Sequence, residues 1–263
     1  MLLEQKNAVI YGGAGRVGRA VAQAFAREGA RVFLAGRTLA TLDEVAAELA
    51  GAGGAVETAR VDALDERAVD AHADHVAETA GGIDVSFNAI SHGDVHGLPL
   101  LEMSLEDFVR PVETAMRSQF LTTRAAARHM VRQGSGVIMA ITATTARLAI
   151  PEVGGTWVAF DAIESLSRQW ACELGRHGVR AIWLQTTGLP ETIADTDLQP
   201  GYGTGPDAMT REELIAWMRR STMLDRLTSL AEVGHMAAFM ASDRAGAVTA
   251  AAANITCGQT PVR

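Results

Sequence analysis

Short apolar runs alternate with longer stretches of helical periodicity along the chain. The runs expected to be β-strands are Ala8–Tyr11, Arg31–Ala35, Ala55–Val61, Ile83–Asn88, Val137–Thr142, Val179–Gln185 and Ala252–Thr256. The helical patterns between them are Arg16–Glu28, Leu39–Ala50, Glu66–Thr79, Leu105–Arg132, Thr156–Gly175 and Leu230–Ser242. This alternation predicts a doubly wound α/β fold, in which helices cover both faces of a seven-stranded parallel sheet.

Glycines mark the ends of three of these helical patterns. Gly29, Gly51 and Gly175 are expected to adopt the left-handed conformation that ends a helix. No repeat, low-complexity tract or interdomain linker is visible, so residues 1–263 are expected to form a single domain.

Residues 192–228 break the alternation after the sixth expected strand. Glycine and proline are frequent between positions 200 and 206, and Thr210 and Glu213 then have the spacing of a capping box. A glycine-rich stretch followed by a short apolar helix predicts a substrate lid. An ordinary surface excursion is the alternative.

Composition narrows the class of protein. The chain has 263 residues, 48% of them hydrophobic, and a net charge of −8 without a basic run, which argues against nucleic acid or an anionic membrane surface as partner. Cys172 and Cys257 are too few for a disulfide framework. The first residues lack a signal-peptide core, and no run approaches the ~18 apolar residues of a membrane span. We therefore expect a soluble, cytoplasmic protein.

A glycine-rich segment joins the first strand to the first helix. Glycines at this point allow a tight turn and let the backbone approach a pyrophosphate, which then lies at the helix N-terminus. The segment predicts a Rossmann fold that binds a dinucleotide. The residues expected to contact the dinucleotide here are Gly12, Gly13, Gly15, Arg16, Val17 and Gly18.

The end of the second strand indicates which dinucleotide is bound. An NAD site usually has an acidic residue there to bind the ribose 2′-hydroxyl. This chain has Gly36, followed by Arg37 and Thr38. A guanidinium can bind a 2′-phosphate through paired hydrogen bonds, so NADP(H) is favoured over NAD(H). A solvated arginine at a strand end is the alternative.

Several later segments carry a resemblance to one family. Pro151–Gly175 resembles the active-site helix of the short-chain dehydrogenase/reductase (SDR) family, and Asp84–Ser91, Gly188–Thr192 and Asn254–Gly258 resemble other segments of it. The resemblance implies a small-molecule substrate and a homo-oligomer, dimer or tetramer, formed through two long alanine-rich helices. It also implies cofactor contacts from Asp62, Asn88, Ala89, Thr142, Gly188 and Thr192.

The spacing of the glycines departs from that of most family members of this length. Such members have a glycine where this chain has Arg16. Arg16 is therefore either a ligand of the phosphates, which we favour, or an obstacle in the cofactor site.

The family's catalytic residues are all replaced. The resemblance places Thr156 at the position of the catalytic tyrosine, Phe160 at that of the lysine, Ala143 at that of the serine and Ala115 at that of the asparagine. A tyrosine near a lysine can approach neutral pKa, whereas an aliphatic hydroxyl near phenylalanine is a far weaker acid. The family's usual mechanism is thereby excluded.

Four residues are candidates for the missing chemistry. They are Thr144 after the fifth strand, Thr156 itself, His92 within the triplet His92-x-Asp94-x-His96, and Asp161 next to the lysine position. Histidine titrates near neutrality, which suits proton transfer. The alternative is that these are ordinary polar residues at strand ends and in a loop. The triplet lacks further ligands nearby, so no metal site is expected.

Three functions fit these observations. The first is an NADP(H)-dependent oxidoreductase with an atypical active site, whose proton donor differs or whose substrate, such as an activated alkene or an iminium, needs none. The second is a non-redox enzyme, such as a cyclase, dehydratase or isomerase. The third is a non-catalytic dinucleotide-binding protein, in which Phe160 and Trp157 would fill the pocket.

Overall fold

A single parallel sheet forms the centre of the protein. The computed structural model describes residues 1–143, 150–193 and 210–260. Within these ranges the strands follow the order β3-β2-β1-β4-β5-β6-β7 across the sheet, and every neighbouring pair is parallel. The strands are β1 (Asn7–Tyr11), β2 (Arg31–Gly36), β3 (Val56–Arg60), β4 (Val85–Asn88), β5 (Gly136–Ala143), β6 (Val179–Thr186) and β7 (Ala252–Asn254). The predicted seven-stranded, doubly wound fold is confirmed.

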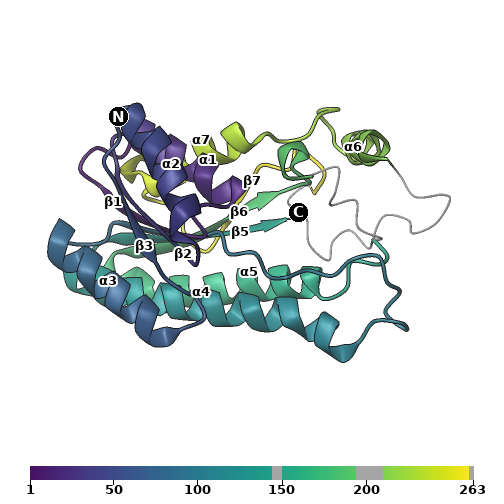
Figure 1. Cartoon of the computed structure of the whole chain (residues 1–263), viewed down its shortest axis with the longest axis horizontal. Coiled ribbons are helices and arrows are strands. Elements are labelled where there is room, and N and C mark those ends of the chain that lie inside the picture. The colour runs from purple at the N-terminus through teal and green to yellow at the C-terminus, as the bar shows by residue number, and fades with distance from the viewer. Residues whose placement is uncertain (144–149, 194–209, 261–263) are drawn as a thin grey trace.

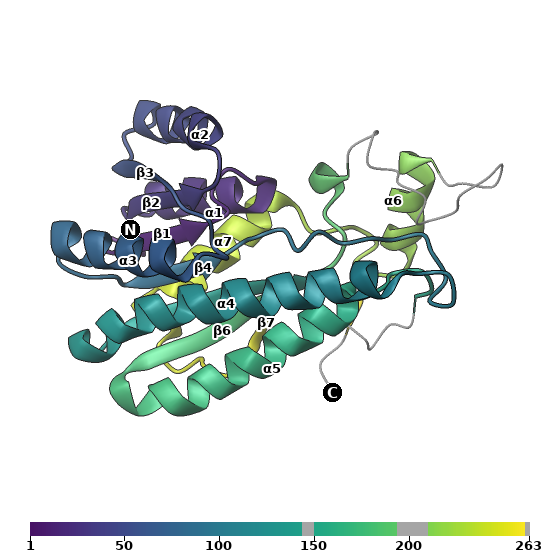
Figure 2. The same cartoon turned by 60° about the horizontal axis from the view of Figure 1, so that its bottom comes forward.

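Helices cover both faces of the sheet, as Figures 1 and 2 show. α1, α2 and α7 lie on one face and α3, α4 and α5 on the other, while α6 lies beyond the end toward which β5 and β6 point. None of these helices is long and apolar enough to cross a bilayer, within the ranges that the structure describes. The bounds are α1 (Arg16–Arg27), α2 (Leu39–Gly51), α3 (Glu66–Ala80), α4 (Leu105–Gln133), α5 (Thr156–Leu174), α6 (Arg211–Arg220) and α7 (Leu230–Ala241).

The core consists of two apolar layers, one on each side of the sheet. Alternate side chains of a strand point to opposite faces, so Ile10 of β1 packs with α1 and α7, whereas Val9 and Tyr11 pack with α3 and α4. Covered on both faces, β1 is apolar along most of its length, as is typical of a strand in a parallel sheet. This burial explains why short apolar runs predicted the strands.

Four of the five alanines expected to permit close approach of a second subunit are buried inside the single chain, and Ala162 is half-buried. Ala125, Ala126 and Ala127 of α4 and Ala159 of α5 are all buried inside the single chain, in the layers that face the sheet. They therefore let these helices approach their own sheet and are not free to form a subunit contact.

At two of the three helix ends, the left-handed conformation was expected at the wrong glycine. Gly29 has a φ of +90°, as expected, but Gly51 is the last residue of α2 and the left-handed residue is Gly53, at +88°. Gly175 stays right-handed, with a φ of −56°, because the chain continues from α5 into a 3₁₀ turn. Gly178 then takes the left-handed conformation, with a φ of +75°.

Gly178 and Gly175 give a matched test of this correction. A methyl group at Gly178 would lie 2.1 Å from the carbonyl oxygen of Gly134, whereas one at Gly175 would meet no atom within 4 Å. We expect Gly178→Ala to lower the free energy of unfolding by more than about 2 kcal/mol. Gly175→Ala should raise it by about 0.4–1 kcal/mol, because the unfolded chain loses freedom. Urea unfolding measures both values, and equal effects would contradict the assignment.

Candidate dinucleotide and substrate site

The glycine-rich segment brings three pieces of backbone into close contact. A Cβ atom on Gly12, which has a φ of +78°, would lie 2.6 Å from the carbonyl oxygen of Ala89 after β4. A Cβ atom on Gly18 would lie 2.3 Å from the carbonyl oxygen of Gly12. Only glycine fits at both positions, and the start of α1 is thereby held at the carboxyl ends of β1 and β4. In doubly wound folds a ligand binds at this point, where the strand order reverses.

The N-terminus of α1 suits an anion. Gly15 is its N-cap and supplies no capping side chain, and the first turn holds no acidic residue. The free backbone N–H groups and the helix dipole therefore favour a negatively charged ligand. Arg16 extends from this turn, and its Nη1 donates a hydrogen bond of 2.6 Å to the carbonyl oxygen of Thr192. These features fit the diphosphate of a dinucleotide.

Two adjoining cavities flank the start of α1. The first, of about 280 Å³, lies at the ends of β1, β2 and β3 and includes the expected cofactor residues Gly12, Gly15, Arg37, Thr38, Asp62 and Ala89. Arg37 is exposed there, directly after β2, whose last residue is Gly36. Asp62 accepts a hydrogen bond of 3.0 Å from the backbone N–H of Leu64, which orients its carboxylate. This cavity has the position and size for the adenosine end of a dinucleotide.

The second cavity has a volume of about 470 Å³ and lies at the ends of β4, β5 and β6. It shares Gly15, Ala89, Ile90 and Ser91 with the first cavity, so the two adjoin. Its lining also includes the expected residues Arg16, Val17, His92, Thr142, Gly188 and Thr192. The cleft therefore brings together residues that lie far apart in the sequence.

Some expected site residues line neither cavity. Gly13 packs against Leu34, and Asn88 is buried, where its amide donates to Thr122 at 3.0 Å and its oxygen accepts from the N–H of Ile90 at 3.0 Å. These two hydrogen bonds of Asn88 hold the segment after β4 against α4. Asp161 is half-buried outside both linings. Thr144 and the part of the expected lid at 194–209 lie outside the described residues.

Thr156, at the tyrosine position, is buried and hydrogen-bonded on both sides. Its hydroxyl lies 3.1 Å from Oδ1 of Asp94 and 2.8 Å from Nε2 of His96. A hydroxyl has one proton and a carboxylate oxygen accepts, so Thr156 donates to Asp94 and accepts from His96. Tyr11 offers no replacement acid, because it is buried within β1 and that burial raises the pKa of its phenol.

Phe160, at the lysine position, connects the cavity with the core. Its ring packs against the apolar cluster that contains Ala115 and Ala159, and it also contributes to the cavity lining. The edge of the His92 ring contacts it, with centroids 5.8 Å apart and planes at 66°. Burial lowers the pKa of the His92 imidazole, while the Asp94 carboxylate acts in the opposite direction. The same two influences act on the pKa of His96.

Glu164 is a polar residue of this region that the sequence analysis missed. Its Oε1 accepts hydrogen bonds of 3.2 Å from the Thr142 hydroxyl and 3.2 Å from Nε2 of Gln185. Glu164 follows Thr156 and Phe160 at intervals of four residues, so it lies on the same face of α5. This spacing is the signal that could have revealed it. Burial raises the pKa of Glu164, and the hydrogen bond from Thr142 acts in the opposite sense.

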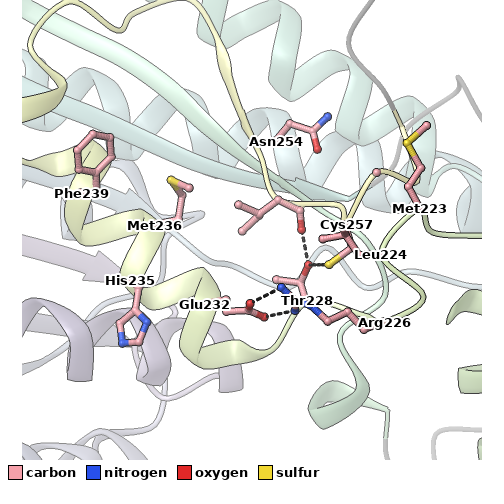
Figure 3. A pocket seen from close by; sticks show the side chains of 12 residues that line it. Met223, Leu224, Arg226, Thr228, Glu232, His235, Met236, Phe239, Asn254 and Cys257 are labelled. Carbon is pink, nitrogen blue, oxygen red and sulfur yellow. Dashed lines mark hydrogen bonds and ion pairs between the residues drawn. The ribbon is translucent and has the colours of Figure 1, made fainter.

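A separate hollow of about 630 Å³ lies between α7 and the segment after β7 (Figure 3). Met223, Leu224, Met236 and Phe239 give it an apolar wall, and the Thr228 hydroxyl near its floor bonds to Ile255 and Cys257. It shares no lining residue with the dinucleotide cleft and contains no expected site residue. Across the described ranges, no group of three or more histidine, cysteine or acidic side chains is arranged to hold a metal ion.

Comparison with known proteins assigns the family. A family model described as Enoyl-(Acyl carrier protein) reductase matches residues 13–260. The uncharacterized oxidoreductase YxbG of Bacillus subtilis (strain 168) is 30% identical over 249 residues, which cover 94% of this chain and 88% of that protein. The chain belongs to the short-chain dehydrogenase/reductase family of oxidoreductases.

Solved structures of other proteins share the fold. Carveol dehydrogenase from Mycobacterium avium in complex with NAD has a TM-score of 0.89 at 22% identity, and the match covers 98% of each chain. Gluconate 5-dehydrogenase from Burkholderia cenocepacia in complex with NADP and tartrate has a TM-score of 0.85 at 21% identity, covering 99% of this chain and 97% of that one. One is bound to NAD and the other to NADP, so the fold itself does not select between the two cofactors.

The raised pKa of Glu164 predicts a pH dependence of stability. A carboxyl that binds its proton more tightly in the folded state makes the folded protein lose stability as pH rises through the interval between the unfolded and folded pKa values. Glu164→Gln keeps an oxygen acceptor for Thr142 but cannot ionise. We expect its stability relative to wild type to increase as pH rises above the ordinary glutamate pKa. Thermal unfolding across this range, with the exposed Glu173→Gln as control, measures the effect; parallel curves for Glu164→Gln and wild type would refute it.

Proposed function

We propose that the protein is an NADP(H)-dependent oxidoreductase of the SDR type, with an atypical active site. The observation that carries the proposal is Arg37, exposed beside the first cavity where β2 ends in glycine rather than an acidic residue. A guanidinium at this point favours a 2′-phosphate, because it forms paired, charge-assisted hydrogen bonds with phosphate oxygens.

Each part of the cofactor has residues that suit it. The N-terminus of α1 and Arg16 bind the diphosphate, Thr38 and Asp62 border the adenosine, and Gly188 and Thr192 border the nicotinamide. When bound, the cofactor supplies or accepts a hydride in the second cavity. The protein itself must then position the substrate and move one proton.

The open second cavity supports an enzyme over a protein that only binds a dinucleotide. A filled pocket is what the non-catalytic function requires. Instead, the ring of Phe160 contributes to the wall of a cavity of about 470 Å³, and Trp157 does not line it. The space accommodates a small-molecule substrate beside the nicotinamide.

A non-redox enzyme on the same scaffold is the second candidate. His92 and Asp94 both line the second cavity, and such converging polar groups are what a cyclase, dehydratase or isomerase would need. Transfer of hydride from NADPH distinguishes the two, since only the oxidoreductase consumes the cofactor.

The contacts of α6 support the proposed lid. The capping box of Thr210 and Glu213 starts this helix, as expected from the sequence. Met218 packs against Gly188 at the wall of the second cavity. Arg211 donates hydrogen bonds to the carbonyl oxygens of Pro190, at 3.0 Å, and Ile193, at 2.8 Å. Movement of α6 would therefore be transmitted to the wall of the cavity.

The apolar side chains on the outer faces of α4 and α5 support a homo-oligomer. Leu105, Val109 and Phe120 on α4 and Val158 on α5 are all exposed, the first of them by 78%. Covering them with a second copy would remove this apolar surface from water.

Replacing Arg37 tests cofactor preference. We expect Arg37→Ala to weaken NADPH binding about 10- to 100-fold, the effect of losing hydrogen bonds to a charged group. NADH lacks the 2′-phosphate, so its binding should change by less than about twofold. Calorimetric titration gives both dissociation constants. Arg176→Ala removes the same charge from the 3₁₀ turn that precedes β6, outside both cavities, and serves as control. Equal weakening of NADH and NADPH would reject the assignment of Arg37.

Replacing Arg16 tests a different part of the cofactor. The diphosphate is common to both cofactors, so Arg16→Ala should weaken NADH and NADPH by the same factor, about tenfold. Calorimetric titration with NADH and with NADPH measures the two dissociation constants. Tighter binding of both cofactors would mean that Arg16 obstructs the site.

A further inference from the structure

The second cavity needs a proton donor, and four hydroxyl groups among its described lining residues already donate hydrogen bonds within the protein. The hydroxyl of Thr142 donates to Glu164, that of Thr186 to the carbonyl oxygen of Thr142, that of Thr187 to Gln259, and that of Thr192 to the carbonyl oxygen of Leu189. Each hydroxyl has a single proton, so none of the four can donate to a substrate without losing its present bond.

The remaining groups of this lining differ sharply in acidity. The guanidinium of Arg16 already donates to the carbonyl oxygen of Thr192, and Ser91 has the weak acidity of an aliphatic alcohol. His92 is the titratable imidazole among the described residues of the lining, and it is buried to 6% exposure. An imidazole can give or take a proton in general acid–base catalysis, and burial lowers the pKa of this one while the Asp94 carboxylate opposes that shift.

Asp94 follows His92 by two residues, and both line the second cavity. A hydrogen bond holds the carboxylate of Asp94 in place. Thr156 donates a hydrogen bond of 3.1 Å to its Oδ1, and His96 donates in turn to Thr156 at 2.8 Å. A carboxylate fixed in this way favours the protonated form of a nearby imidazole. The His92 ring also makes an edge-to-face contact with the ring of Phe160.

We propose that His92 transfers the proton to or from the substrate, and that Asp94, held by Thr156 and His96, is its positioning residue. This rests on the proposed oxidoreductase function. In the reduction of a carbonyl compound, the reduced dinucleotide would supply the hydride that adds to carbon, and the imidazolium of His92 gives a proton to oxygen. The product is an alcohol, and the neutral imidazole regains its proton from water; oxidation runs in reverse.

The first test compares turnover with cofactor binding in the full-length protein. The probe is NADPH with 2,3-butanedione, a small activated ketone whose reduction requires a proton on oxygen. We expect His92→Gln to lower kcat about 100-fold or more, the usual effect of losing a positioned acid. The Kd for NADPH, measured by calorimetry, should stay within about threefold, because His92 is not expected to hold the cofactor. His75→Gln, exposed on α3, is the matched control.

The second test separates positioning from a merely structural role. Thr156→Val removes the hydrogen bond to Asp94 together with the one from His96 to Thr156, and we expect kcat to fall about tenfold, within the range for losing part of an acid–base unit. Thr156→Ser keeps a hydroxyl and should restore most of the rate. Asp94→Asn should lower the pKa of His92, read from its imidazole NMR signal. Among the described residues, Arg16 lines the same cavity as His92, and Arg110 of α4 lies beside the neighbouring Gly93.

The outcomes distinguish this inference from the proposed function. Failure of wild type to bind NADPH would overturn the oxidoreductase itself, and the role of His92 with it. Binding of NADPH with undiminished kcat in His92→Gln would overturn the role of His92 alone. Binding of NADPH without any reduction of the diketone by wild type would also count against that role.

Discussion

The close approach of Gly12 to Ala89 and Gly18 is the constraint on which the cleft depends. A side chain at Gly12 or Gly18 would overlap backbone atoms of a neighbour, so β1, β4 and α1 can meet at this point only through glycine. Because β1, β4 and α1 are in contact there, the N-terminus of α1 points to the gap between the ends of the two strands. Gly15 and Ala89 then appear in the lining of both cavities. The close packing at Gly12 thus determines where the first and the second cavity lie.

Thr156 and Phe160, which the resemblance aligns with the family's tyrosine and lysine, are physically compatible with one another. A tyrosine without a nearby cation would keep a pKa of ~10 and be a poor acid at neutral pH. Once an apolar ring occupies position 160 and joins the core, a phenol at position 156 has no charge to lower its pKa. The threonine hydroxyl instead bonds to Asp94 and His96. Phe160 thereby contributes an apolar wall to the cavity, and Thr156 supports Asp94 from outside the lining.

Local patterns predicted most of the fold because they reflect burial along the chain. The apolar runs identified all seven strands of the described sheet, and the Thr210–Glu213 spacing identified the start of α6. The glycine-rich turn and the position of Arg37 beside a cavity also followed from the sequence order of strand, turn and helix. Contacts between residues far apart in the sequence could not be predicted in this way. Thr156 meets His96 over 60 positions of sequence, and no local pattern encodes that distance.

Polar groups carried on a loop, such as those that we propose act on the substrate, need to be held in place. A side chain on α5 is fixed by the helix, whereas the segment after β4 turns through left-handed glycines, Gly93 at a φ of +73° and Gly97 at +87°. Its backbone is tied to the segment before α5 by the hydrogen bond of 2.8 Å from the N–H of Gly97 to the carbonyl oxygen of Glu152. Thr156 adds a side-chain tie at the first turn of α5. A loop can present a reactive group with useful accuracy only when such ties fix it to a rigid element, and here both run to α5 and the turn that precedes it.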